Sequence, residues 1–207
     1  IKKFNISNIN SFEKMILKNV DSKKTYVIRS SGVDEDNFDA SFAGMMSSYL
    51  SVNVDSIFTF IKKTYLSAFS KRALNYRHMN NLSTMNIKMA VIVQEMIDAD
   101  ISGVLFTINP VTNNPDEFLI SVVKGLGESL VSGEENSVDY VVNAGNIEGN
   151  NPLLTKKEIL KITELGYLIL RDSHTFQDIE FCLKDGILYF LQTRTIVPYK
   201  NIDIKEP

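Results

Sequence analysis

Two short segments near the C-terminal end of the chain carry polar side chains at alternate positions. Asp178 and Glu180 lie two residues apart in the first segment, and Gln192 and Arg194 lie two residues apart in the second. Because side chains alternate between the two faces of a strand, each pair would lie on one face. Carboxylate and amide oxygens suit Mg²⁺, and arginine binds a phosphate through two parallel hydrogen bonds. The four residues could therefore hold a magnesium–phosphate group.

These pairs meet only if the two segments form a hairpin of suitable register. The expected strands are residues 178–183 and 187–194, on either side of the turn 184–186. If the turn has three residues, Asp178 faces Gln192, and Glu180 lies diagonal to Gln192. A two-residue turn would split the pairs between the two faces. Spacing alone leaves a second interpretation open, namely a solvated polar face on an edge hairpin.

A second candidate site lies at the end of an earlier strand, expected over residues 25–30. Arg29 stands at the tip of this apolar strand, and small residues follow it. Ala43 and Gly44 come later, in a loop where small side chains let the backbone approach a ligand closely. Backbone N–H groups in such a loop can cradle phosphates. Taken alone, this pattern indicates an anion-facing turn only weakly.

The elements that must position these residues are strands and amphipathic helices. Caps and apolar residues at helical spacing predict helices over residues 12–19 behind Ser11, over 54–76 behind Asn53, and from a Thr155/Glu158 capping box to Arg171. The other expected strands are residues 47–52, 87–96, 102–108, 118–123 and 138–142. Strands outnumber helices and cluster as hairpins. This pattern predicts an α+β fold, an antiparallel-rich sheet with helices packed on it.

Composition excludes several classes of protein. The chain has 207 residues, 44% of them hydrophobic, which is ordinary for a cored domain. Its net charge of −3 and its lack of a long basic block argue against nucleic-acid binding. No apolar stretch approaches the ~20 residues of a membrane span, so a soluble cytoplasmic protein is expected. The single cysteine, Cys182, is interpreted as a buried structural thiol, and neither His78 nor His174 has the neighbours of a zinc site.

Five segments of the chain form an ordered set of motifs: IRSSGVDEDNFDASFAGMMSSYLSV (28–52), KRALNYR (71–77), AVIVQEMIDADISGVLFTINPVT (90–112), KGLGESLVSGEENSVDYVV (124–142) and DIEFCLKDGILYFLQTRTI (178–196). Taken in this order, they resemble one family, that of phosphoenolpyruvate synthases, pyruvate phosphate dikinases and rifampin phosphotransferases. The resemblance covers nearly the whole chain, from about Tyr26 to Ile196. It implies an ATP-grasp fold, in which residues 1–200 form the larger part of the nucleotide-binding clamp of a multidomain enzyme. Residues 201–207 would be a linker.

The resemblance implies roles at the phosphate end of a bound nucleotide. Arg29 would contact the phosphates, and Arg72 would approach the terminal ones. Gly44 and Met45 would lie in a mobile lid loop over the phosphates, and Ser48 keeps a hydroxyl where the family usually has threonine. Together with Arg194, Arg29 and Arg72 would be the catalytic residues.

The resemblance also implies residues for the base and for the metal. Gln94 would mark the strand on the adenine side, and the hinge to the base would be Glu95, Met96 and Ile97. Glu180 and Gln192 would hold Mg²⁺. Arg194, with Asp178 nearby, would complete the phosphate site. This supports the magnesium–phosphate interpretation of the hairpin over the solvated-face interpretation.

The family cleaves ATP to AMP and passes a phosphoryl group, through a histidine on a swivelling domain, to an acceptor. The implied partners are therefore ATP, the phosphohistidine domain and an acceptor-substrate domain, with pyruvate, rifampin or glutamine as candidate acceptors. The family's N-terminal lysine and glycine-rich segment and its Thr-Ser-His motif have no match here, so the isolated chain is expected to be inactive or nearly so. A degenerate regulatory module that binds nucleotide without chemistry is the alternative. A protein-interaction domain is a third hypothesis, and it is disfavoured because such a domain does not require metal ligands.

Overall fold

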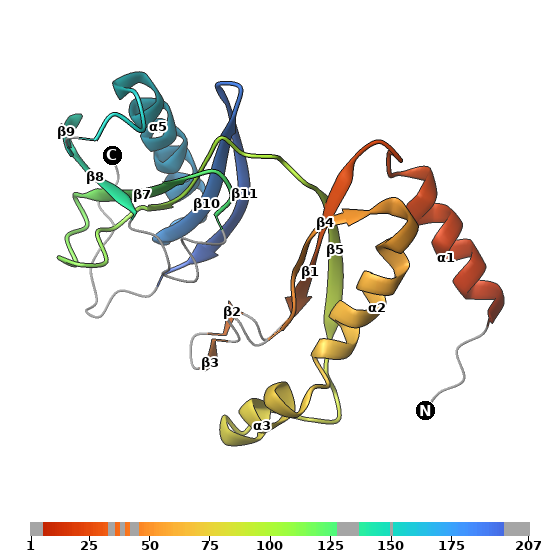
Figure 1. Ribbon diagram of the computed structural model, residues 1–207. Helices are drawn as coiled ribbons and strands as arrows, with labels where there is room; N and C mark the ends of the chain where they lie inside the picture. Colours follow the sequence, from red (N-terminus) through yellow and green to blue (C-terminus); the bar gives the residue numbers. More distant parts are fainter. Residues whose placement is uncertain are drawn as a thin grey trace. The chain divides into compact units, whose positions relative to one another are not determined.

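The computed structural model describes residues 6–32, 36–37, 40–41, 46–127, 137–149 and 151–196. The chain divides into two compact units, Ile1–Met96 and Ile97–Pro207 (Figure 1). Each unit has its own sheet and its own hydrophobic core. Both units combine helices with antiparallel strands, so the expected α+β class is confirmed.

The first unit is built on a three-stranded sheet in the order β4-β1-β5. Its strands are β1 (Thr25–Gly32), β4 (Tyr49–Asn53) and β5 (Met89–Glu95), and β1 pairs antiparallel with both neighbours. Helix α2 (Ile57–Ser67) packs on one face of this sheet (Figure 1). The buried core consists of Tyr26, Ile28, Val52 and Ile57. Two two-residue strands, β2 (Asp36–Asn37) and β3 (Ala40–Ser41), pair with each other.

The prediction of a single long helix over residues 54–76 is wrong. The chain forms a short 3₁₀ helix, η1 (Val54–Ser56), then α2, then a separate helix α3 (Lys71–Met79). The break arises because Ser70 adopts an extended backbone and its hydroxyl accepts a hydrogen bond from Ala73 N–H at 3.2 Å. A serine that caps a new helix ends the previous one. The first helix, α1 (Ile6–Lys18), also begins earlier than expected, so Ser11 lies inside it and does not cap it.

The second unit is built on a six-stranded antiparallel sheet in the order β11-β10-β6-β7-β8-β9. The strands are β6 (Ile101–Phe106), β7 (Phe118–Lys124), β8 (Val138–Asn143), β9 (Asn146–Glu148), β10 (Gln177–Lys184) and β11 (Ile187–Thr195). All but β9 were expected. The β8–β9 hairpin turns through Ala144 and Gly145, both with positive φ, which is the backbone of a tight two-residue turn.

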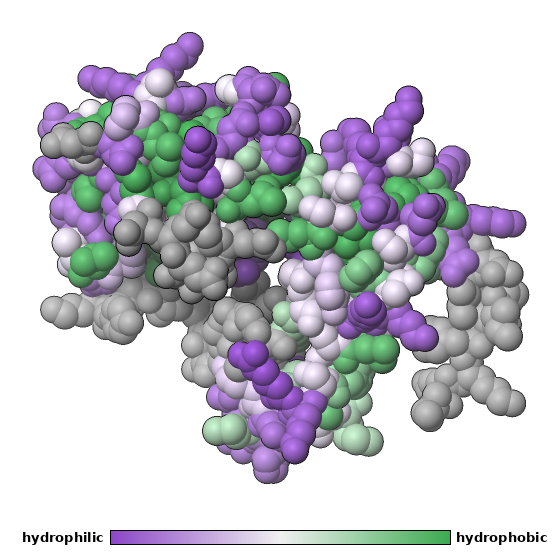
Figure 2. All heavy atoms as spheres, in the orientation of Figure 1, coloured by the Kyte–Doolittle hydropathy of each residue, from purple (hydrophilic) through white to green (hydrophobic). Residues whose placement is uncertain are grey.

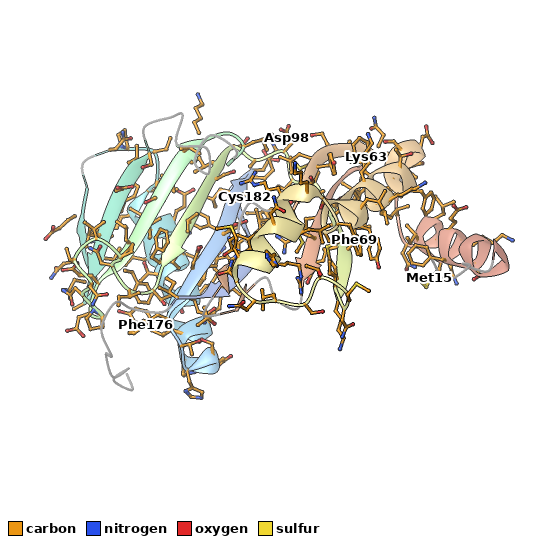
Figure 3. All side chains as sticks on the ribbon, turned by 90° about the horizontal axis from the view of Figure 1, so that it is seen from below. Met15, Lys63, Phe69, Asp98, Phe176 and Cys182 are labelled. Carbon is orange, nitrogen blue, oxygen red and sulfur yellow. The ribbon has the colours of Figure 1, made fainter. Side chains whose placement is uncertain are left out.

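Helix α5 (Lys156–Ser173) covers one face of this sheet. Its start confirms the expected capping box, because Thr155 Oγ1 accepts from Glu158 N–H at 3.3 Å and Glu158 Oε2 accepts from Thr155 N–H at 2.8 Å. The core between helix and sheet is formed by buried residues that include Leu105, Phe118, Ile120, Ile162, Ile179 and Phe181. Cys182 is 1% exposed and lies on β10 (Figure 3), and burial raises the pKa of its thiol, as suits a structural cysteine.

Hydrophilic side chains cover much of the visible surface of each unit, with hydrophobic side chains exposed between them (Figure 2). On helix α1, Phe12, Met15 and Leu17 are each about half exposed. Within the described ranges, no helix is both long and apolar enough to cross a membrane.

Candidate functional site

The β10–β11 hairpin places Glu180 opposite Gln192, and Asp178 opposite Arg194. On β10, the intervening residues Ile179 and Phe181 belong to the core under α5. The four polar side chains therefore lie on the other face of the sheet. The four residues share a face, but the three-residue turn and the pairing of Asp178 with Gln192 that were predicted to bring them together are wrong.

The register differs because the turn has two residues and not three. Lys184 pairs with Ile187, and the intervening Asp185 and Gly186 have φ values of 50° and 74°. Positive φ at both central positions is the type I′ geometry that matches the twist of the flanking strands. Such a turn alone would have placed Gln192 and Arg194 on the α5 face.

A β-bulge in β11 restores the shared face. Phe181 pairs with Phe190, whereas the next residue, Glu180, pairs with Gln192, so Leu191 is an extra residue in β11. Up to Phe190, the even-numbered residues Leu188 and Phe190 of β11 lie on the α5 face. Beyond Leu191, the even-numbered residues Gln192 and Arg194 lie on the polar face. Sequence reasoning missed this bulge. Its only signal is the run ILYFL (187–191), which has no alternation of apolar and polar residues.

The electrostatics of this face favour an added cation. Arg194 Nη2 lies 3.8 Å from Glu180 Oε1, and these side chains are 35% and 32% exposed, so the ion pair is long and leaves carboxylate oxygens open to another ligand. Burial raises the pKa of Asp178; Arg194 opposes this effect, and the charge of Glu180 adds to it. Two carboxylates beside one guanidinium leave a local excess of negative charge, which a divalent cation would relieve.

The apolar flank of the site comes from β6. Val104 pairs with Glu180, and Phe106 pairs with Asp178, so apolar side chains stand directly beside both carboxylates. This neighbourhood explains why the carboxyl of Asp178 is desolvated although it lies on the face away from α5.

The donor set fits Mg²⁺ better than zinc. Among the residues that the structure describes, no group of three or more His, Cys, Asp or Glu is arranged to hold a metal. A cation here would rest on the carboxylate of Glu180, the amide oxygen of Gln192 and, nearby, Asp178. Mg²⁺ accepts such a partial protein shell, because it keeps water and phosphate oxygens in its remaining positions.

In the first unit, β1 and β5 bring Arg29 and Gln94 onto one face. Tyr26 and Ile28 point into the core under α2, so Val27 and Arg29 occupy the opposite face. Gln94 pairs with Val27 and shares that face, and it lies diagonal to Arg29. The sheet thus places the guanidinium of Arg29 and the side-chain amide of Gln94 on the same face.

The expected hinge begins where β5 ends. Glu95 pairs with Tyr26, so its side chain lies on the α2 face, away from Gln94, and forms an ion pair with Lys24 at 2.7 Å. Any contact of Glu95 with a ligand on the Gln94 face would therefore come from its backbone. Met96 N–H donates to Thr25 O at 2.9 Å, and Ile97 is the first residue of the second unit.

The remaining predicted site residues are Gly44, Met45, Ser48 and Arg72. Gly44 and Met45 lie outside the described residues. Ser48 is exposed and directly precedes β4, and its neighbour Ser47 is tied to α2 by a 3.1 Å hydrogen bond from Ser47 N–H to Ser67 Oγ. Arg72 is exposed in the first turn of α3, outside the sheet that carries Arg29.

The fold and this face define an α+β domain with a candidate site for a divalent cation and a phosphate. Comparison with known proteins identifies the family. The sequence profile described as "Pyruvate phosphate dikinase, AMP/ATP-binding domain" matches residues 6–149. The chain belongs to this family, which confirms the resemblance seen in the sequence.

Curated relatives agree with this assignment. A probable phosphoenolpyruvate synthase of Methanocaldococcus jannaschii is 27% identical over 93% of this chain and 19% of its own length. A rifampicin phosphotransferase of Bacillus cereus is 32% identical over 87% of this chain and 24% of its own length. A phosphoenolpyruvate synthase of Pyrococcus furiosus is 37% identical over 68% of this chain and 17% of its own length. The chain therefore spans less than a third of each of these relatives.

Proposed function

We propose that this chain is the ATP-binding part of a dikinase-type phosphotransferase and that it is built as an ATP-grasp clamp. The observation that carries the proposal is the register of β10 and β11, which sets two carboxylates, an amide and a guanidinium on one face. Membership in the AMP/ATP-binding family supports the same conclusion. Residues 1–200 would form this domain within a larger protein.

In the second unit, Glu180 and Gln192 would hold Mg²⁺, with Asp178 beside them. The metal would supply positive charge to the phosphate oxygens, which lowers the barrier to phosphoryl transfer. Arg194 is held only loosely by Glu180, at 3.8 Å, so it is available to donate to a phosphate. Together these residues would bind, orient and neutralise the phosphates.

In the first unit, Arg29 would contact phosphate oxygens and Gln94 would mark the adenine side. The base would meet the hinge residues Glu95, Met96 and Ile97, with Glu95 acting through its backbone because its carboxylate is paired with Lys24. The lid residues Gly44, Met45 and Ser48 would cover the phosphates. Arg72 would approach the terminal phosphates.

In the parent protein, ATP would be split to AMP, and a phosphoryl group would pass through a histidine on another domain to an acceptor. The names of the relatives support two kinds of acceptor chemistry, since they include phosphoenolpyruvate synthases and rifampicin phosphotransferases. Pyruvate, rifampin or a divergent acceptor such as glutamine would be chosen outside this chain.

Calorimetric titration with Mg²⁺–ATP and with Mg²⁺–ADP tests the proposal. Glu180→Gln keeps the shape of the side chain and removes its charge, so nucleotide affinity should fall by about tenfold or more in the presence of Mg²⁺, an effect of ~1.4 kcal/mol or more. Glu164→Gln is the matched control, because Glu164 is exposed on α5, which packs on the opposite face of the sheet. A Glu180→Gln variant that binds Mg²⁺–ATP as tightly as the wild type would refute the site.

A further inference from the structure

The bulge that creates the polar face also weakens the strand that carries it. Among the described strands, β11 lies at the edge of its sheet with β10 as its one neighbour, and four of its residue pairs with β10 lie beyond Leu191. A slip of one residue in this short stretch would turn Gln192 and Arg194 toward the α5 face. The site therefore needs an interaction that fixes the register beyond the bulge.

Gln177 supplies such an interaction. It is 4% exposed, and it occupies the same face of β10 as Ile179, opposite the polar site. Its Oε1 accepts a 2.6 Å hydrogen bond from the Thr193 hydroxyl, and its Nε2 donates to Thr195 Oγ1 at 3.4 Å. These two threonines are the chain neighbours of Arg194, so one buried amide is bonded on both sides of the guanidinium-bearing residue.

Gln177 is itself fixed in place. Its Nε2 also donates to Thr175, at 2.7 Å to the hydroxyl and 3.2 Å to the carbonyl oxygen. Its backbone N–H donates to Thr107 Oγ1 at 2.7 Å, and its carbonyl accepts from Thr107 N–H at 2.9 Å, just beyond the end of β6. Gln177 therefore links the end of β11, through its side chain, to the end of β6, through its backbone.

We propose that Gln177 is a positioning residue that locks the register of β11 beyond the Leu191 bulge. In the native register it faces threonine hydroxyls, whereas a slip of one residue would bring Gln192 or Arg194 to its face and remove those hydroxyls. A buried amide that loses its partner carries a desolvation penalty, so the slipped register is disfavoured. The consequence for nucleotide binding rests on the proposed function, but the register is a property of this chain alone.

Two variants of Thr193 separate the hydroxyl from the shape of the side chain. Thr193→Val keeps the β-branch that suits a strand and removes the donor to Gln177, whereas Thr193→Ser keeps the donor. Thr193 is exposed, so neither change disturbs the core. Gln177→Leu removes the amide itself and is the second route to the same loss, and Thr195→Val, which loses only the 3.4 Å contact, is a graded control.

The register is read by nuclear Overhauser contacts between facing residues, Glu180 with Gln192 and Asp178 with Arg194, and binding is read by titration with Mg²⁺–ATP. We expect Thr193→Val and Gln177→Leu to weaken these contacts and to lower affinity by about tenfold, as a displaced ligand set would. Thr193→Ser should stay within about twofold of wild type.

Unchanged cross-strand contacts in Thr193→Val and Gln177→Leu would overturn the register lock, whatever happened to affinity. If the contacts shift as expected but the affinity for Mg²⁺–ATP stays at the wild-type value, the positioning role stands and the proposed phosphate site on β10 and β11 fails. The two ideas are therefore tested separately.

Discussion

At the scale of single residues, Asp178 shows a conflict between stability and function. Its carboxyl is desolvated beside Phe106, and burial raises its pKa above the ordinary value. A carboxyl with a raised folded-state pKa binds its proton more tightly in the folded state, so stability falls as pH rises from the ordinary pKa through the folded one. Above that window, the charge of Asp178 destabilises the fold.

We therefore expect Asp178→Asn to stabilise the chain by about 1 kcal/mol at neutral pH and to weaken Mg²⁺–ATP binding. Urea unfolding measures the first effect, and the gain should vanish below about pH 3, roughly one unit under the ordinary pKa, where the wild-type carboxyl is protonated in both states. Asp116→Asn, at an exposed position, is the control for removing a negative charge. A variant that is less stable than wild type at neutral pH would show that Asp178 makes stabilising contacts that outweigh its desolvation.

At the scale of elements, the packing of β6 against its neighbours depends on Gly103. A Cβ added there would lie 2.7 Å from a ring carbon of Phe181, from the carbonyl oxygen of Ser121 and from a methyl of Val122. Alanine would improve strand propensity by up to ~1 kcal/mol, but overpacking costs roughly 1–3 kcal/mol, and one of the clashing atoms is backbone. Gly103→Ala should therefore destabilise the chain by about 2 kcal/mol in urea unfolding.

Gly186→Ala is the comparison for this experiment. A Cβ at Gly186 would meet nothing within 4 Å, but its φ of +74° is strained for alanine, so the expected loss is about 1 kcal/mol from conformation alone. If Gly103→Ala cost no more than Gly186→Ala, the close contacts around β6 would not limit the sheet.

Most strands could be predicted because each is a short, mostly apolar run between polar or turn-forming segments. The start of α5 could be predicted because the Thr155/Glu158 pair satisfies backbone donors locally. The break before α3 could not, because the apolar stripe continues through it and only the capping hydroxyl of Ser70 ends the helix.

For the candidate site, spacing predicted that each polar pair lies on one face of its own strand, but it did not predict the register that brings the two pairs onto the same face. It depends on two backbone features, the turn at Asp185-Gly186 and the bulge at Leu191. Each shifts the pairing by one residue in the same direction, and the total shift of two residues returns the polar side chains to one face. An apolar run without alternation cannot reveal where a bulge falls. The contribution of Gln177 was equally hidden, because its partners Thr193 and Thr195 are defined only by the register.

At the scale of the whole molecule, the candidate residues belong to both units, with Arg29 and Gln94 in the first and Glu180 and Arg194 in the second. Each unit has its own core, so ligand effects can be read separately in each by amide hydrogen exchange. Mg²⁺–ATP should slow exchange in β1 and β5 and also in β10 and β11. At a ligand concentration of about 100 times Kd, exchange through global unfolding should slow by roughly 100-fold.

The variant Glu180→Gln should lose this protection in both units, whereas Glu164→Gln should keep it. Mg²⁺ alone is the reference, because it separates an effect of the metal on β10 and β11 from an effect of the nucleotide. Protection confined to the second unit would mean that Arg29 and Gln94 take no part in binding. Protection confined to the first unit, unchanged by Glu180→Gln, would remove the β10–β11 face from the proposed site, because a metal–phosphate contact there must restrain the strands that make it.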